Sequence, residues 1–315
     1  MNRKAIIFGI KGIKLKNEEI NLLKKFKPWG IILFSRNIKN LQQLKKLIKE
    51  IKMIMRDVKY PILIDQEGGR ISRLDKIIDF SIFSQAFFGD LYKNDRKNFY
   101  YYYKVYIEKI SSIFTSTGIN INTVPVLDVL DNANNKIIGD RSFSSNSISV
   151  SNLGSLCIKL FNDNKIGTVM KHIPGHGGTN QDSHFTLPIV NKNKDELRRK
   201  DFLPFKKCNS FFAMTAHVVY KAYDSNFAAT HSKIIIEEII RKHIKFKGLL
   251  ISDDISMKAL KFDIKKNTTL ALDAGCNLVL HCNANIKEMK MLANIVPKID
   301  SFTLKKTSQF YNFLR

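Results

Sequence analysis

The sequence predicts a (β/α)₈ barrel of the TIM type, formed as a single domain by residues 1–315. Short apolar runs rich in β-branched residues alternate with longer segments of helical periodicity along the whole chain. Strands that alternate with helices form parallel βαβ units, and eight such units over this length favour a closed barrel. A doubly wound sheet is the alternative that shares this alternation. No Gly/Pro/Ser-rich linker and no internal repeat divides the chain, which favours one domain.

Eight segments are expected to form the barrel strands. They are residues 5–10, 30–35, 61–65, 118–126, 167–172, 211–217, 248–253 and 277–282. The clearest helical patterns between them cover residues 41–55, 98–114, 149–162 and 232–244. Ser232 opens the last pattern and is expected to be its N-cap, because a serine hydroxyl can accept a hydrogen bond from a free N–H of the first helical turn.

The composition is that of an ordinary globular protein, with 44% hydrophobic and 25% charged residues. No segment approaches the roughly 18 apolar residues that cross a membrane. The apolar run at residues 5–10 is shorter than the roughly 7–15 residues of a signal-peptide core, and no small-residue cleavage site follows it. We therefore expect a first buried strand there, a cytoplasmic protein and no membrane partner.

The formal net charge of +24 comes from 52 Lys and Arg against 28 Asp and Glu. A basic surface attracts nucleic acids. Here, however, the basic residues are mostly lysines spread through the chain, as in KNEEINLLKKFK, and they form no cluster. This distribution is typical of solvated helix faces, so we expect no specific nucleic-acid partner.

The four cysteines form no CxxC pair and therefore give no zinc or redox motif. We expect them to be reduced thiols, most of them buried, as in a reducing compartment. They are Cys157, Cys208, Cys276 and Cys282.

Polar and acidic residues follow the expected strands at their C-terminal ends, which is the face of a barrel where active sites are built. Packing alone does not require this distribution. The segments in question are Asp65–Arg70, Asn122–Asp128, Lys171–His172, His217 and Ser252–Asp254.

The segment KHIPGHGGTNQDSH, residues 171–184, allows two interpretations. Imidazole and carboxylate are common metal ligands, so His172, His176, Asp182 and His184 could hold a metal ion. The cation of Lys171 would oppose such an ion. In the other interpretation, Asp182 hydrogen-bonds His184 and fixes its tautomer, so that His184 can donate a proton to a leaving group and later accept one from water.

The segment ISDDISM, residues 251–257, supplies two adjacent carboxylates at a strand end. Neighbouring side chains of a strand point to opposite sides, so one carboxylate is expected to face a substrate and the other to accept local hydrogen bonds. A carboxylate in that position suits covalent catalysis on a sugar. Capping of the next helix is the simpler alternative.

These motifs together resemble the β-N-acetylhexosaminidases of glycoside hydrolase family 3, of the type that recycles bacterial cell wall. The matching segments occur in the family's order over roughly residues 5–285. They are ILIDQEGGRISRL, GININTVPVLDV, GDRSF, KHIPGHGGTNQDSH, MTAHVVY, ISDDISMKAL and DAGCNLVL. The combination of KH-PGHG, DSH at this spacing and SDD-SM downstream is highly specific.

The resemblance implies a retaining double displacement that uses no cofactor and no metal. It makes Asp253 the nucleophile and His184 the acid/base, with Asp182 as the partner of His184. It also assigns sugar binding to Asp65, Arg73, Arg141, Lys171 and His172. The implied substrate is a terminal β-linked N-acetylglucosamine, as in an N-acetylglucosaminyl-anhydromuropeptide.

Three alternatives stay open at this point. The enzyme could be an N-acetylglucosaminide phosphorylase, because a histidine acid/base does not repel incoming phosphate as a carboxylate does. It could be a metal-dependent hydrolase that uses His172, His176, Asp182 and His184. The chain could also be a non-enzymatic barrel that binds sugar or nucleic acid. We expect a monomer.

Overall fold

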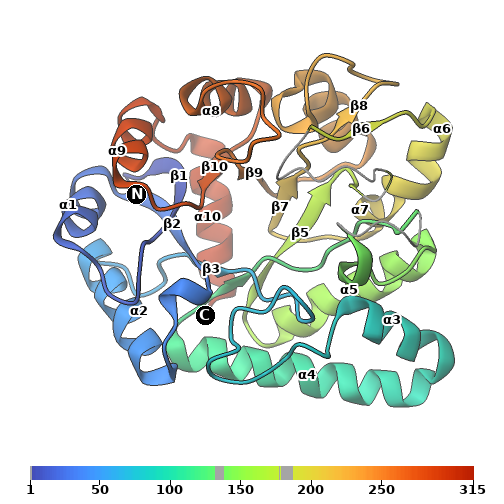
Figure 1. The fold of residues 1–315 in the computed structure, drawn as a ribbon, viewed down its shortest axis with the longest axis horizontal. Coiled ribbons are helices and arrows are strands. Elements are labelled where there is room, and N and C mark those ends of the chain that lie inside the picture. The colour runs from blue at the N-terminus through green and yellow to red at the C-terminus, as the bar shows by residue number, and fades with distance from the viewer. Residues whose placement is uncertain (1, 132–137, 177, 179–186) are drawn as a thin grey trace.

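The computed structural model describes residues 2–131, 138–176, 178 and 187–315. At its centre eight parallel strands close into a barrel, in the order β1-β10-β9-β7-β5-β4-β3-β2 (Figure 1). Each expected strand overlaps one of them, although the expected strand at residues 118–126 is much shorter in the structure, and the barrel confirms the predicted fold class. The strands are β1 (Lys4–Gly9), β2 (Pro28–Leu33), β3 (Ile62–Ile64), β4 (Ile121–Asn122), β5 (Gly167–Ile173), β7 (Phe212–Thr215), β9 (Leu249–Asp254) and β10 (Leu278–His281).

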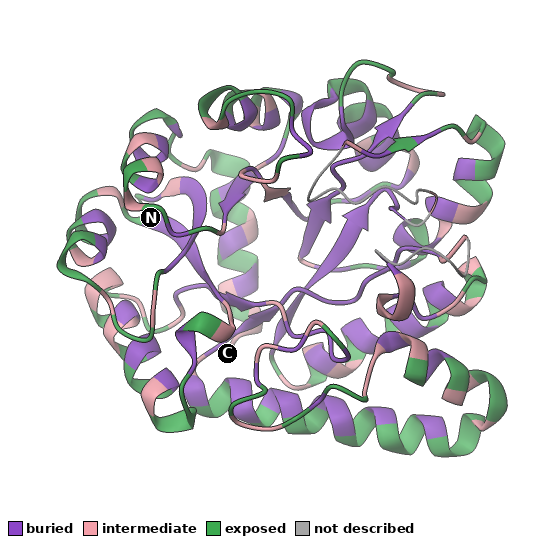
Figure 2. Cartoon of the chain, in the orientation of Figure 1, coloured by how far each residue is buried: buried purple, intermediate pink, exposed green. Residues whose placement is uncertain are grey.

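Helices surround the barrel, and their buried faces turn toward it while their exposed faces turn outward (Figure 2). The longer ones are α1 (Asn17–Phe26), α2 (Leu41–Met55), α3 (Gln85–Asn94), α4 (Arg96–Thr117), α5 (Ser147–Asp163), α8 (Ile264–Ala274), α9 (Ile286–Ile295) and α10 (Ser301–Phe313). Short elements lie in the connections: η1 (Ser35–Asn37), η2 (Gly139–Arg141), α6 (Lys194–Glu196), η3 (Leu197–Asp201), α7 (Leu203–Lys207) and η4 (Ala229–His231). A separate small sheet pairs β6 (Ile189–Val190) with β8 (Val219–Tyr220).

The helix expected at residues 232–244 forms, but as the π-helix η5 (Ile235–His243) and not as an α-helix. Its last bond shows the wider turn: the backbone N–H of Ile244 donates to the carbonyl of Ile239 at 2.8 Å. Two α-helical residues, 233 and 234, precede η5. Ser232 caps the start of this helical segment as expected, since its hydroxyl accepts from the N–H of Ile235 at 3.1 Å. The buried isoleucines repeat every four residues, a spacing that keeps them on one face in either kind of helix, so the pattern could not distinguish the two.

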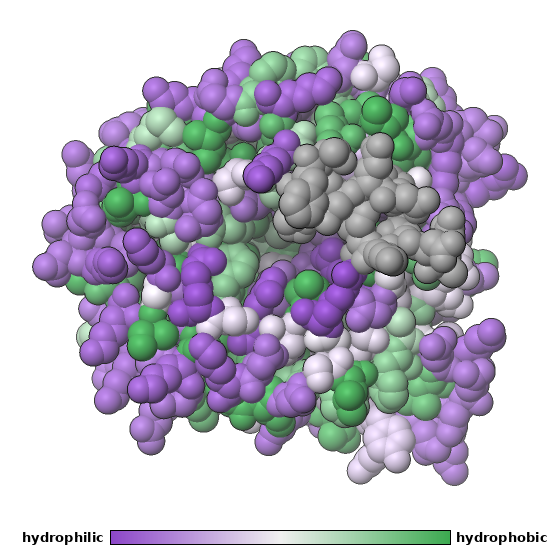
Figure 3. Space-filling model, viewed as in Figure 1, coloured by the Kyte–Doolittle hydropathy of each residue, from purple (hydrophilic) through white to green (hydrophobic). Residues whose placement is uncertain are grey.

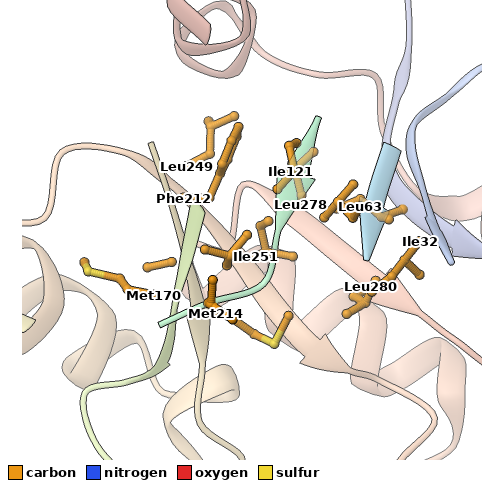
Figure 4. Packing of buried hydrophobic residues seen from close by; sticks show 14 of the residues in the cluster. Ile32, Leu63, Ile121, Met170, Phe212, Met214, Leu249, Ile251, Leu278 and Leu280 are labelled. Atoms are coloured by element: carbon orange, nitrogen blue, oxygen red, sulfur yellow. The ribbon is translucent and has the colours of Figure 1, made fainter. Parts of the chain in front are cut away.

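The core of the barrel consists of apolar side chains from neighbouring strands (Figure 4). Leu63, Ile121, Phe212, Ile251 and Leu278 are each at most 1% exposed. Burying a side chain of this size contributes about 1.5–3 kcal/mol. This packing holds the strands in register, and their C-terminal ends therefore have fixed positions relative to one another.

The structure bears on the expected state of the cysteines and on the expected lack of a membrane span. All four cysteines are free thiols: Cys157, Cys208 and Cys276 are buried and Cys282 is half-buried, as expected for reduced thiols. Within the described ranges, none of the helices combines the length and the apolar character needed to span a bilayer.

Candidate active site

The C-terminal ends of the barrel strands enclose a pocket of about 200 Å³. The space-filling view is hollowed near its centre (Figure 3). Six residues that the sequence singled out line this pocket from four different parts of the chain. They are Asp65, Arg73, Arg141, Lys171, His172 and Asp253.

Asp182 and His184, the expected acid/base pair, lie outside the described residues. After β5, which ends at Ile173, the structure describes the chain up to residue 176, then residue 178, and then residues from 187 onward. The roles of Asp182 and His184 therefore stay predictions.

Asp253 and Asp254 both border the pocket, at the end of β9, but their surroundings differ. The carboxylate of Asp254 accepts hydrogen bonds from the Ser256 hydroxyl at 2.8 Å and from the backbone N–H of Cys282 at 3.2 Å. Asp253 accepts one hydrogen bond, from the backbone N–H of Asp254 to Oδ1 at 2.8 Å. Among the described residues, Oδ2 of Asp253 has no hydrogen-bond donor. One carboxylate oxygen of Asp253 is thus left without a donor from the described residues, whereas Asp254 is held by local bonds.

The charge of Asp253 is favoured by the groups around it. Burial alone would raise its pKa, but His217, His172 and the N–H of Asp254 hold that pKa below its ordinary value. His217 is itself fixed, because its Nε2 donates to the carbonyl of Asp254 at 3.0 Å and its Nδ1 lies 2.7 Å from the hydroxyl of Thr230. Asp253 is therefore ionised at neutral pH, as a nucleophile requires.

Asp65, just after β3, is held by three side chains. Its Oδ1 accepts from the Thr123 hydroxyl at 2.6 Å and pairs with the Lys171 ammonium, and its Oδ2 accepts from Nη2 of Arg73 at 3.0 Å. Burial would raise the pKa of Asp65, but Lys171 and Arg73 hold it well below its ordinary value. A sugar hydroxyl at this position would meet an ionised acceptor with cations beside it.

Glu67 pairs with two cations of the pocket, and its own side chain is only 1% exposed. Arg141 binds it in a bidentate manner, with Nε and Nη2 each 2.8 Å from a carboxylate oxygen. The Lys171 ammonium lies 2.6 Å from Oε1 of Glu67. Burial would raise the pKa of Glu67, yet Arg141 and Lys171 lower it, and the pKa values of both cations are raised in turn although burial opposes this. These pairs keep both Arg141 and Lys171 charged and oriented.

The loop that follows β3 can place Glu67 against these cations because the next residue is Gly68, which has φ +89°. A Cβ at this position would lie 2.1 Å from the carbonyl oxygen of Phe83 and 2.5 Å from the hydroxyl of Tyr106. Any other residue would push the loop outward and displace the adjacent Glu67.

Asp128 holds the two histidines of the KH-PGH segment. Its carboxylate, which is fully buried, accepts from Nδ1 of His172 at 2.7 Å, from the N–H of His172 at 3.2 Å and from the N–H of His176 at 2.6 Å. Burial would raise the pKa of Asp128, but His172 lowers it. A carboxylate can only accept, so Nδ1 of His172 carries its proton and Nε2 is the ring nitrogen left for the pocket.

Comparisons with known proteins decide the family. The model of the glycosyl hydrolase family 3 N-terminal domain matches residues 4–307. The chain belongs to glycosyl hydrolase family 3. A β-hexosaminidase of Haemophilus influenzae is 34% identical over 299 residues, which cover 92% of this chain and 83% of that protein. The match confirms the resemblance and the enzyme class, a glycosidase of the β-N-acetylhexosaminidase type.

Solved structures of the family agree with the fold. The crystal structure of NagZ from Neisseria gonorrhoeae has a TM-score of 0.86 and 30% identity, and the match covers 100% of this chain and 90% of that one. A family 3 β-N-acetylglucosaminidase from a Paenibacillus strain has a TM-score of 0.83 and 26% identity. That match covers 98% of this chain but only 60% of the longer Paenibacillus chain.

The pocket of this family 3 chain also has an apolar side. Phe34, after β2, lines it together with Met214 and Met257. The guanidinium of Arg36 lies 4.5 Å from the centre of the Phe34 ring and that of Arg73 lies 5.5 Å from it. These two cations hold the ring in place at the edge of the pocket. A sugar has polar edges and apolar faces, and this pocket offers both kinds of surface.

The supporting acids Glu67 and Asp128 were not predicted as site residues, although both lie in the polar segments at the strand ends. Glu67 lies two residues after Asp65, a spacing that puts both side chains on one side of an extended chain, and this signal could have found it. Asp128 could not be assigned from its spacing, because its partners lie 44 and 48 residues away in the chain.

The possible metal ligands are only partly described. His172 and His176 line the pocket, with ring centroids 5.8 Å apart. Nδ1 of His176 is buried without a partner among the described residues, and burial lowers the pKa of His176 to about 4. In the part of the chain that the structure covers, no three His, Cys, Asp or Glu side chains converge as metal ligands would.

Proposed function

We propose that this enzyme is a retaining exo-β-N-acetylglucosaminidase, with Asp253 as its nucleophile. The main support is the contrast between the two adjacent aspartates. Asp254 is engaged by Ser256 and Cys282, while Asp253 offers the pocket an ionised carboxylate with one oxygen free of donors among the described residues. A pocket of about 200 Å³ suits one terminal sugar better than an internal stretch of a glycan chain.

The proposed reaction is a double displacement. Asp253 attacks the anomeric carbon as His184, oriented by Asp182, protonates the departing oxygen. His184 then takes a proton from water as the water oxygen attacks the anomeric carbon. The bond from that carbon to Asp253 breaks, which releases the sugar and restores the carboxylate. Asp65, Arg73, Arg141, Lys171 and His172 bind hydroxyl and acetamido groups of the sugar, and no cofactor or metal is needed in either step.

We further propose that the substrate is an N-acetylglucosaminyl-anhydromuropeptide derived from peptidoglycan. The likeness to NagZ of Neisseria gonorrhoeae supports this assignment. We also propose that the protein is a cytoplasmic monomer with one domain over residues 1–315, without a membrane or specific nucleic-acid partner.

Hydrolysis of a chromogenic β-N-acetylglucosaminide, with and without phosphate, tests this function. We expect N-acetylglucosamine as the product in both buffers. Sugar 1-phosphate as the main product in phosphate would replace the hydrolase by a phosphorylase. Full activity is expected in excess chelator; loss of activity that zinc or manganese restores would replace the proposed chemistry by a metal-dependent one.

A further inference from the structure

A second pocket, of about 580 Å³, opens at the opposite end of the barrel from the active site. It is built by the segment that leads into β9, by the residues just before β10 and by α10, which lies behind the barrel in Figure 1. The first two segments lie before the N-terminal ends of their strands, whereas the active-site residues lie at or after the C-terminal ends of theirs. The pocket is therefore separate from the catalytic one.

Four cations and one carboxylate line this pocket, which gives it a net charge of +3. They are Arg241, Lys247, Lys305, Lys306 and Asp300. Asp300 is the N-cap of α10, and its Oδ1 accepts from the N–H of Thr303 at 2.7 Å. Within the described ranges, none of the four cations has a carboxylate within ion-pair distance.

Arg241 is the fixed centre of this charge. Its Nη1 donates to the carbonyls of Phe246 at 3.0 Å and Gly248 at 2.9 Å, and its Nη2 donates to Asn277 Oδ1 at 2.8 Å. These acceptors orient the guanidinium without neutralising it. Its Nε and the second N–H of Nη2 have no partner among the described residues. Because Arg241 is only half-buried, these remaining N–H groups are available to an anion that enters the pocket.

Aromatic rings hold the cations close together. The guanidinium of Arg241 lies 5.3 Å from the centre of the Phe246 ring and 5.8 Å from that of Phe302. The ammonium of Lys306 lies 5.7 Å from the same Phe302 ring. Partial burial and the repulsion of Lys305, Arg241 and Lys247 lower the pKa of Lys306. Like charges crowded in this way are relieved when an anion binds between them.

We propose that this pocket binds a small phosphate-bearing molecule, and that Arg241, Lys247 and Lys306 contact its phosphate group. A phosphate group suits the site better than a single carboxylate, because it carries about −1.5 to −2 charges at neutral pH and presents several oxygens to a guanidinium fork. The volume lies in the range of roughly 300–1,000 Å³ that small-molecule pockets have. This binding is independent of the glycosidase reaction.

Calorimetric titration of the whole protein with pyrophosphate and with inorganic phosphate, at a fixed ionic strength of about 0.15 M, tests the proposal. We expect saturable binding that weakens about tenfold or more in the double variant Lys247→Gln/Lys306→Gln. Arg241→Gln is expected to weaken it too, but this variant also removes three structural hydrogen bonds, so the lysine pair carries the test.

The matched control is Lys45→Gln/Lys49→Gln, which removes the same charge from exposed positions of α2. It should bind pyrophosphate as the unaltered protein does, and both double variants should keep full glycosidase activity. Absence of saturable binding, or an equal loss in the control, would overturn the proposal. Binding of duplex DNA that depends on the lysine pair, without binding of pyrophosphate or phosphate, would identify a general polyanion surface and would overturn it as well.

Discussion

The carboxylate of Asp128 accepts a hydrogen bond from Nδ1 of His172 at 2.7 Å, and the same carboxylate accepts the N–H of His176 at 2.6 Å. One buried acid therefore fixes both the ring of His172 and the backbone where the chain leaves β5. The Nε2 of His172 is consequently held toward the pocket before any sugar arrives. Orientation of this kind lowers the entropic cost of binding the substrate in its reactive position.

We expect Asp128→Asn to reduce kcat/KM by about tenfold to hundredfold. The amide places an N–H₂ group opposite N–H donors of His172 or His176 that the carboxylate accepts. At least one buried donor then lacks an acceptor, which costs about 1–3 kcal/mol. Steady-state kinetics together with a thermal melt would measure the effect. Asp163→Asn is a suitable control, because that carboxylate is exposed and forms a surface ion pair with Lys159 on α5. Unchanged kinetics in Asp128→Asn would show that His172 does not need this acid.

Glu67→Gln is expected to destabilise the fold at neutral pH by about 3 kcal/mol, because it removes a buried counter-charge from Arg141 and from the buried Lys171. The effect should depend on pH. The folded pKa of Glu67 lies below its ordinary value of 4.5, so its contribution to stability is fully present above that pH and is lost as the pH falls through the lowered pKa.

Urea unfolding of both proteins at pH 7 and at pH values below 4 tests this dependence. The difference in the free energy of unfolding should shrink toward acid pH. Glu108→Gln serves as the control, since that exposed residue forms a surface ion pair with Lys104 along α4 and should change stability by less than about 0.5 kcal/mol. A difference that stays constant with pH would mean that the charge of Glu67 is not what stabilises the fold.

The strand ends were the part of the site that the sequence could predict. Apolar runs bounded by Asp65, Lys171 and Asp253 revealed both the strands and the residues that emerge from them, because alternation and strand ends are local features. The motifs then supplied their expected roles. Eight strands with this periodicity leave few topologies other than a barrel, so the fold followed from the same evidence.

The supporting contacts could not be predicted in the same way. Arg141 meets Glu67 across 74 residues of chain, and Lys171 meets Asp65 across 106. Such pairs depend on the register and closure of the barrel, which no local pattern contains. The π-helical form of η5 has a similar origin, because the isoleucine spacing fits two helix types and only the hydrogen bonds distinguish them.

His184→Ala is expected to impair cleavage of a disaccharide much more than the first step on a p-nitrophenyl glycoside. General acid catalysis contributes about 10²–10⁴-fold, and a sugar alkoxide needs the proton far more than a p-nitrophenolate does. Asp182→Asn should show a milder form of the same bias. Pre-steady-state measurement on both substrates is required, because the second step can limit the steady state. Equal losses in the first step would assign the proton transfer to another group.

The most direct test of the account is chemical trapping of the nucleophile. A 2-fluoro or 5-fluoro glycosyl inactivator forms a glycosyl-enzyme that breaks down slowly, and peptide mass spectrometry locates the labelled residue. Asp253 has one carboxylate oxygen without a donor among the described residues, and the carboxylate of Asp254 is engaged. This contrast predicts a single label on Asp253, and Asp253→Ala should be neither labelled nor active. A label on Asp254, or on any other carboxylate, would contradict the assignment of the nucleophile.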